Sequence, residues 1–204
     1  MTKIKLCGLS RPCDIEWANA LKPDFVGFVF AKKSKRYVTP EDARALRADL
    51  GPDIRVVGVF VREDPEIVAA LLNSGLIDLA QLHGGEDDAC ILRLRALTDR
   101  PLIQAFRVDS PADLIRAKAS LADHILLDNG PGGTGTVFDW RYLQGFDRPY
   151  LLAGGLSPEN VKIAVKTLRP WAVDVSSGIE TDGKKDYNKM KAFVEAVRAS
   201  GEEG

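Results

Sequence analysis

The chain has 204 residues, of which 45% are hydrophobic and 28% are charged. This length can bury a full hydrophobic core in one domain, and the composition is that of an ordinary globular protein. The 28 basic and 29 acidic residues nearly cancel, which excludes a broad charged surface for nucleic acid or an anionic membrane. Any anionic ligand must therefore be held by a local group of residues.

The lack of recognisable targeting signals and the number of cysteines further restrict the class of protein. No apolar run approaches the roughly 20 residues that span a bilayer, and the N-terminal residues lack the order of a signal peptide, so we expect a cytoplasmic protein. The three cysteines, Cys7, Cys13 and Cys90, form no CxxC pair. Their odd number and their spacing indicate neither a disulfide framework nor a thiolate metal site.

Eight short apolar runs follow one another along the chain, and each precedes a helical stretch of about ten residues. The runs cover residues 4–8, 25–30, 56–60, 77–82, 101–106, 124–128, 150–154 and 172–176. Helix-start signals occur at Ser10 and Pro12, Thr39-Pro40-Glu41, Asp64-Pro65-Glu66, Ser110-Pro111 and Ser157-Pro158-Glu159. The alternation predicts an α/β fold, a single (β/α)8 TIM barrel with eight parallel strands over residues 1–199, followed by a disordered tail at 200–204.

An open, doubly wound sheet is the competing fold. Its dinucleotide fingerprint GxGxxG is absent after the first strand, where the chain reads CGLSRP. Eight units are also more than one such sheet commonly carries. The barrel is therefore favoured.

The carboxyl ends of barrel strands carry the active site, and these ends are chemically unusual here. Because successive strand residues point to opposite faces, polar side chains on several strands are expected to face the barrel axis. The expected inward residues are Lys5, Cys7, Gln81, His83, Gln104, Leu126, Asp128 and Asp174. We hypothesise a buried polar network below the site with Lys5 and Asp174 as its charged members, since isolated buried charges are costly.

Cys7 and Asp128 are the candidate acid–base residues. Cys7 lies at a strand end near a helix start, where the helix dipole and Lys5 or Arg11 would stabilise a thiolate. An inert core cysteine is the alternative. Asp128 follows the apolar residues HILL on an inward position, where desolvation would favour the protonated form that an acid needs. A simple turn former is the alternative for this aspartate.

The remaining candidates concern substrate binding. His83 is interpreted either as a substrate contact or as a structural residue, and His124 at the bottom of its strand as structural. The glycine segments 153–160 and 175–180 follow strands seven and eight, where barrels often build a phosphate site from backbone N–H groups. The segment 130–135, GPGGTG, suits a mobile lid, and Arg36 could clamp a carboxylate.

With these motifs in order, the chain resembles the phosphoribosylanthranilate isomerase family of tryptophan biosynthesis over nearly its whole length. The matching segments are KLCGLSRP (5–12), VGFVFAKKSKRYV (26–38), VGVFV (57–61), QLHG (81–84), LLDNGPGGTGTVFDW (126–140), LAGGLSPENV (152–161) and DVSSGIE (174–180). Leu6 and Ser10 are conservative departures from the family's usual isoleucine and threonine.

The resemblance implies an Amadori rearrangement of N-(5-phosphoribosyl)anthranilate to 1-(o-carboxyphenylamino)-1-deoxyribulose 5-phosphate, without cofactor or metal. By analogy, Cys7 is the general base, Asp128 the general acid and Arg36 the partner of the anthranilate carboxylate. The implied phosphate site comprises Gly154, Gly155, Ser176, Ser177 and Gly178. The expected partner is a small phosphorylated substrate, with no nucleic acid or membrane, and the expected state is a monomer, with a homodimer as the alternative.

Three other functions stay open. A ribulose-phosphate epimerase would share the late glycines but needs a metal with histidine ligands. A barrel isomerase acting on a histidine-pathway ribonucleotide would use aspartates at strands one and five, where this chain has Cys7 and Phe106. A non-catalytic barrel that binds a sugar phosphate would bind ligand tightly without turnover.

Overall fold

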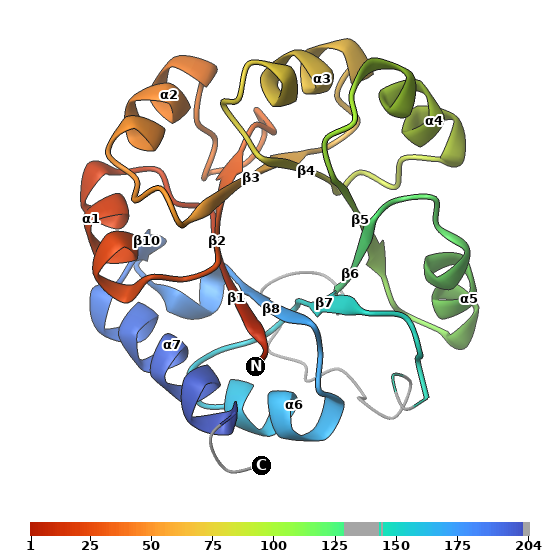
Figure 1. The fold of residues 1–204 in the computed structure, drawn as a ribbon. Helices are drawn as coiled ribbons and strands as arrows, with labels where there is room; N and C mark the ends of the chain where they lie inside the picture. Colours follow the sequence, from red (N-terminus) through yellow and green to blue (C-terminus); the bar gives the residue numbers. More distant parts are fainter. Residues whose placement is uncertain (129–142, 144, 202–204) are drawn as a thin grey trace.

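The computed structural model describes residues 1–128, 143 and 145–201. Eight parallel strands close into a barrel in chain order, and helices surround it as an outer ring (Figure 1). The strands are β1 (Lys3–Cys7), β2 (Phe25–Val29), β3 (Arg55–Phe60), β4 (Leu79–Leu82), β5 (Leu102–Arg107), β6 (His124–Asp128), β7 (Tyr150–Leu152) and β8 (Ala172–Val175). Closure occurs between β1 and β8, where Lys5 lies beside Asp174. The predicted barrel is confirmed.

Seven helices follow in the described residues. They are α1 (Pro12–Leu21), α2 (Pro40–Ala48), α3 (Pro65–Asn73), α4 (Asp88–Leu97), α5 (Pro111–Ala119), α6 (Val161–Leu168) and α7 (Tyr187–Gly201). No helix in this part of the chain has the length and apolar character needed to cross a membrane. The predicted lid, residues 130–135, lies outside the described residues. Helix α7 extends two residues into the predicted tail and ends at Gly201.

Most helix starts agree with their sequence signals. The side chains of Thr39 and Asp64 accept backbone N–H groups of α2 and α3, which satisfies donors that have no partner within the first helical turn. The start predicted at Ser157 is wrong, because α6 begins at Val161. The Ser157 N–H instead donates to the Asn160 side chain at 2.9 Å, so this segment forms a turn before the helix.

The core has two layers. Nine buried residues from the strands and their ends pack together inside the barrel: Phe25, Val57, Leu79, Ile103, Ala105, Leu126, Leu151, Ala153 and Ala172. A larger buried cluster, including Leu6, Val26 and Ile15, lies between strands and helices. Each strand is therefore buried on both faces, as parallel strands under helices generally are.

The prediction that Gln104 faces the barrel axis is wrong. Its neighbours Ile103 and Ala105 belong to the interior cluster, so Gln104 lies on the opposite face of β5. There its amide donates to the Glu86 carbonyl oxygen at 2.7 Å and accepts from the Ser120 hydroxyl. Because these polar partners lie outside the barrel, the Gln104 amide can be buried there with its hydrogen bonds satisfied and does not need to face the barrel axis.

A small hairpin follows β8 and was not predicted. The short 3-10 helix η2 (Ser177–Ile179) leads into β9 (Glu180–Thr181) and β10 (Lys184–Lys185), which pair antiparallel. Asp182 and Gly183 form its two-residue turn with φ of 52° and 74°, the left-handed conformation that Asp-Gly favours in hairpins. This hairpin places the charged side chains of Glu180 and Lys185 behind the end of β8.

Candidate active site

A cavity of about 350 Å³ opens at the carboxyl ends of the barrel strands. All of the predicted site residues except Gly178 line this cavity. They are Cys7, Arg36, His83, Asp128, Gly154, Gly155, Ser176 and Ser177. Residues from β1, β4, β6 and the loops after β2, β7 and β8 therefore meet in one place, although they are distant in the sequence.

Cys7 ends β1 and is 7% exposed, beside the apolar side chains of Val29 and Val59. A Cβ atom at Gly27 would lie 2.7 Å from its sulfur, so the glycine on β2 makes room for the thiol. Burial raises the pKa of Cys7, while the nearby Lys5 ammonium opposes that rise. The buried position therefore favours the thiol over the thiolate.

Arg11 does not serve as the predicted partner of the Cys7 thiolate. Its Nε and Nη2 atoms donate to Asp14 Oδ1 at 3.0 and 2.6 Å. Asp14 also accepts the backbone N–H of Ser10 and Arg11. This carboxylate satisfies the start of α1 and holds Arg11 there.

Lys5 and Asp174 form the predicted buried pair below Cys7. Lys5 Nζ lies 2.9 Å from Asp174 Oδ1, and the two side chains are 0% and 8% exposed. Burial lowers the pKa of Lys5, but the negative charge of Asp174, together with that of Cys7 whenever it is a thiolate, outweighs this effect and the net pKa is raised. The pair therefore keeps an ammonium ion under the thiol.

Asp128 ends β6 and contacts His83. The Asp128 Oδ2 atom is 3.2 Å from His83 Nε2, and His83 Nδ1 is 2.7 Å from the Gln81 amide nitrogen. With the amide nitrogen as donor, Nδ1 must accept and Nε2 carries the proton toward Asp128. Gln81 Oε1 is buried without a hydrogen-bond partner among the described residues. His83 therefore contacts Asp128 and also lines the cavity.

The glycines after β7 and β8 have separate functions. Gly154 and Gly155 line the cavity with φ of 85° and 64°, values that favour glycine. Gly178 lies behind the lining, where an added Cβ would be 2.0 Å from the Leu156 carbonyl oxygen. It allows the two loops to approach, which brings Ser176 and Ser177 beside Gly154 and Gly155.

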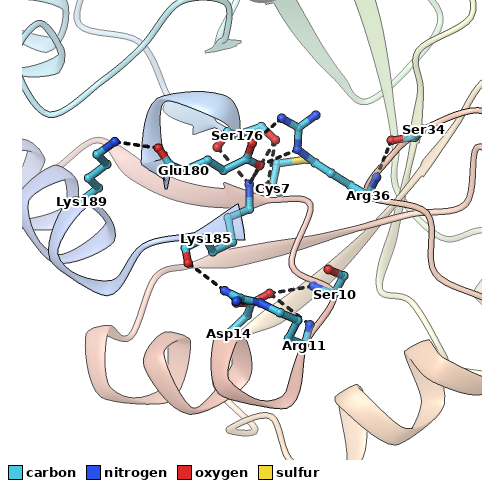
Figure 2. A network of polar contacts seen from close by, with 10 residues as sticks. All are labelled: Cys7, Ser10, Arg11, Asp14, Ser34, Arg36, Ser176, Glu180, Lys185 and Lys189. Carbon is cyan, nitrogen blue, oxygen red and sulfur yellow. Dashed lines mark hydrogen bonds and ion pairs between the residues drawn. The ribbon is translucent and has the colours of Figure 1, made fainter. Parts of the chain in front are cut away.

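Arg36 follows β2 and lies over the ends of β1 and β8. A Cβ atom at Gly8 would be 2.4 Å from Arg36 Cδ, so Gly8 leaves room for the arginine stem. Its Nε and Nη2 donate to Glu180 at 2.6 and 2.8 Å. Lys185 Nζ donates to the same carboxylate at 2.6 Å (Figure 2).

Neither Glu180 nor Lys185 was predicted as a site residue, although Glu180 ends the segment 175–180. Neither lies on a barrel strand, and two-residue strands are too short for a periodic signal. The Asp182-Gly183 dipeptide is a hairpin signal that brings residues on either side of it together. It could have identified the pairing of Lys185 with Glu180, although not their contact with Arg36.

Within the described residues, no group of three or more histidine, cysteine or acidic side chains could hold a metal ion. His124 does not line the cavity. Its ring stacks on Trp171 with ring centroids 4.6 Å apart. Burial lowers its pKa. The stacked contact is consistent with a structural histidine.

Comparison with known proteins agrees with this geometry. Residues 4–196 match the family model described as N-(5'-phosphoribosyl)anthranilate isomerase. A relative with that name from Thermoanaerobacter sp. (strain X514) is 44% identical over 97% of this chain and 98% of its own. The crystal structure of phosphoribosyl anthranilate isomerase from Thermotoga maritima is 36% identical with a TM-score of 0.87, covering 98% of this chain and all of that one.

A further crystal structure contains a bound ligand. It is an isomerase of the same name in complex with reduced 1-(o-carboxyphenylamino)-1-deoxyribulose 5-phosphate, 36% identical with a TM-score of 0.83 over 98% of this chain and 100% of that chain. Similarity in sequence and in structure thus extends over nearly the full length. The chain belongs to the N-(5'-phosphoribosyl)anthranilate isomerase family.

Proposed function

We propose that this chain isomerises N-(5'-phosphoribosyl)anthranilate to 1-(o-carboxyphenylamino)-1-deoxyribulose 5-phosphate in tryptophan biosynthesis, with Cys7 as general base and Asp128 as general acid. The observation that carries the proposal is that Cys7 and Asp128 line one cavity together with Arg36 and the glycine loops. Acid and base must reach two different atoms of the same sugar. Strands β1 and β6 lie well apart around the ring, which separates the two groups as this requires.

The reaction begins with a proton from Asp128. This proton goes to the ribose ring oxygen, the bond from that oxygen to C1 breaks, and a protonated imine forms at C1. The positive charge acidifies the C2 proton, which the Cys7 thiolate removes, and its bonding electrons form the enolamine. Tautomerisation of the enolamine gives the ketone. The His83 contact at 3.2 Å keeps the Asp128 carboxyl oriented for its step.

Lys5 supports the thiolate that this step uses. Burial favours the neutral thiol, so deprotonation needs a compensating positive charge. The Lys5 ammonium, which lies below Cys7, opposes the rise in the pKa of Cys7, and Asp174 keeps that ammonium charged. The buried pair is therefore part of the acid–base chemistry as well as of the core.

Substrate orientation follows from the two ends of the cavity. We assign the phosphate to Gly154, Gly155, Ser176 and Ser177, where glycine backbone allows close approach to N–H groups. Arg36 would receive the anthranilate carboxylate, since a guanidinium matches a carboxylate in shape and charge. These two anchors would hold the sugar between acid and base.

The partner is a small phosphorylated molecule, and the proposed state is a monomer. We also propose a cytoplasmic location. All three cysteines are free, as is usual in a reducing compartment.

The test follows the loss of phosphoribosylanthranilate fluorescence after addition of the purified protein. Turnover is expected for the wild type, and Cys7→Ala and Asp128→Asn should each lower kcat by about 100- to 10,000-fold. Cys7→Ser should also be much slower, because a hydroxyl is a poor base at neutral pH. Cys13→Ala is the matched control, since Cys13 does not line the cavity, and it should retain full activity.

Two outcomes contradict different parts of the proposal. Full activity in both Cys7→Ala and Asp128→Asn would exclude their assigned functions while leaving the reaction intact. Tight binding of the product by the wild type without any turnover would instead favour a non-catalytic sugar-phosphate-binding barrel.

A further inference from the structure

Three charged residues, Arg36, Glu180 and Lys185, form what we call the Arg36 cluster. The Glu180 carboxylate lies between the guanidinium and the ammonium (Figure 2). It accepts Arg36 Nε and Nη2 at 2.6 and 2.8 Å and Lys185 Nζ at 2.6 Å. The Glu180 and Lys185 side chains are only 6% and 2% exposed, so water screens these contacts little.

Arg36 alone of the cluster reaches the active-site cavity. It lines the cavity, whereas Glu180 and Lys185 do not. Glu180 occupies the guanidinium edge made by Nε and Nη2, which leaves Nη1 on the other edge. Glu180 therefore acts on a ligand in this cavity through Arg36, whereas Lys185 can act through Glu180 and Arg36 or through Ser176, which also lines the cavity.

Lys185 is also held by hydrogen bonds to Ser176, which lines the cavity. Its ammonium donates to the Ser176 carbonyl oxygen at 2.9 Å and to the Ser176 hydroxyl at 3.3 Å. That hydroxyl donates to the Cys7 carbonyl oxygen at 3.1 Å. Burial lowers the pKa of Lys185, and Glu180 opposes that effect. The cluster thus joins the ends of β1 and β8 behind the cavity.

The charges of the cluster suggest why two cations share one carboxylate. Arg36 and Glu180 by themselves sum to zero, and a neutralised guanidinium attracts an anion weakly. With Lys185 the cluster carries one net positive charge. Buried ion pairs often add little stability, because desolvation offsets the attraction between the charges, so stability alone gives a weak reason for a second buried cation.

We propose that Glu180 and Lys185 are positioning residues for carboxylate recognition: Glu180 fixes the orientation of Arg36, and Lys185 cancels the charge of Glu180 so that Arg36 attracts the aromatic carboxylate of the substrate. This inference rests on the proposed function and deepens it. It assigns a specificity function to the hairpin that carries both residues.

The experiment compares two ligands by isothermal titration calorimetry. One is reduced 1-(o-carboxyphenylamino)-1-deoxyribulose 5-phosphate, and the other is its phenylamino counterpart without the carboxylate. The ratio of their dissociation constants isolates the contribution of the carboxylate, since any general damage affects both. Lys185→Met should lower the preference for the carboxylate ligand by about ten- to a hundredfold, because Glu180 then neutralises Arg36. Lys184→Met, at an exposed neighbour on the same hairpin, should leave the ratio unchanged.

The double variant gives the sharpest result. Adding Glu180→Gln to Lys185→Met removes the negative charge that neutralises Arg36, so part of the lost preference should return, although an amide offers Arg36 one acceptor oxygen in place of two. A purely structural hairpin would instead make the double variant as weak as the single one or weaker. Lys185→Gln, which keeps hydrogen-bonding capacity without charge, should behave like Lys185→Met and replaces it if that variant does not fold, as judged by circular dichroism.

An unchanged ratio in folded Lys185→Met or Lys185→Gln would overturn the inference, as would a double variant without recovery. Both results leave the proposed function standing if the wild type isomerises phosphoribosylanthranilate. Absence of wild-type turnover would overturn the proposed function itself, and the turnover assay detects that case separately.

Discussion

Replacing Lys5 by Met should strongly destabilise the barrel. The change leaves the Asp174 carboxylate, which is 8% exposed, without the ammonium now 2.9 Å away. Removing one member of a buried ion pair typically costs about 3–5 kcal/mol, because the remaining charge stays desolvated. Replacing both, as Lys5→Met with Asp174→Leu, should leave the free energy of unfolding within about 1–2 kcal/mol of the wild type.

Equilibrium urea unfolding followed by circular dichroism measures these differences. With a denaturant slope of about 2–3 kcal/mol per M, the single variants should lower the midpoint by roughly 1–2.5 M. Lys118→Met is the control, because its ion pair with Asp147 is 59% and 67% exposed. Such a surface pair should contribute less than about 1 kcal/mol.

Comparison of the single and double variants shows whether Lys5 and Asp174 stabilise the barrel as one coupled pair. A double variant that loses the sum of the two single losses would mean that Lys5 and Asp174 stabilise the barrel independently. A loss below about 1 kcal/mol in Lys5→Met would mean that the buried carboxylate is easily neutralised or hydrated. Either result would refute the account of this pair as one coupled unit.

Two further predictions concern the cavity. Gly178→Ala places a Cβ 2.0 Å from the Leu156 carbonyl oxygen, so the loops after β7 and β8 must separate, and KM should rise about tenfold or more with a smaller change in kcat. Gly51→Ala, whose Cβ would come no closer than 3.3 Å to its nearest neighbouring atom, is the control, and equal KM values in the two variants would contradict the steric argument. Because burial raises the pKa of Cys7 and only the thiolate acts as base, the residual kcat of Asp128→Asn, in which Cys7 is the only member of the acid–base pair that still titrates, should increase with pH through the neutral and alkaline range. A residual kcat of Asp128→Asn that is flat with pH in the fluorescence assay would argue against Cys7 as the base.

The sequence was sufficient to predict the barrel and the residues at the strand ends. Polar or glycine residues interrupt apolar runs at those ends, and the parallel order of βα units brings all such ends to one face of a barrel. Cys7, His83 and Asp128 could therefore be expected in one cavity, and they line it together. Whether each performs its assigned step remains a prediction.

Side-chain direction was less predictable. Barrel strands are buried on both faces, so the hydrophobic pattern alone does not say which face holds a polar residue. Lys5 was placed correctly, whereas Gln104 was not, because the Glu86 carbonyl and the Ser120 hydroxyl offered it partners outside the barrel. Those partners are distant along the chain and are brought to Gln104 only by folding.

The sequence by itself determined the order of the elements, the glycines at tight approaches and the chemical groups available at the strand ends. Only the tertiary structure decided which charges meet. Arg36 shares Glu180 with Lys185, although about 144 residues separate Arg36 from that carboxylate along the chain. Electrostatic attraction depends on distance in space and on burial, and closure of the barrel between β1 and β8 establishes both.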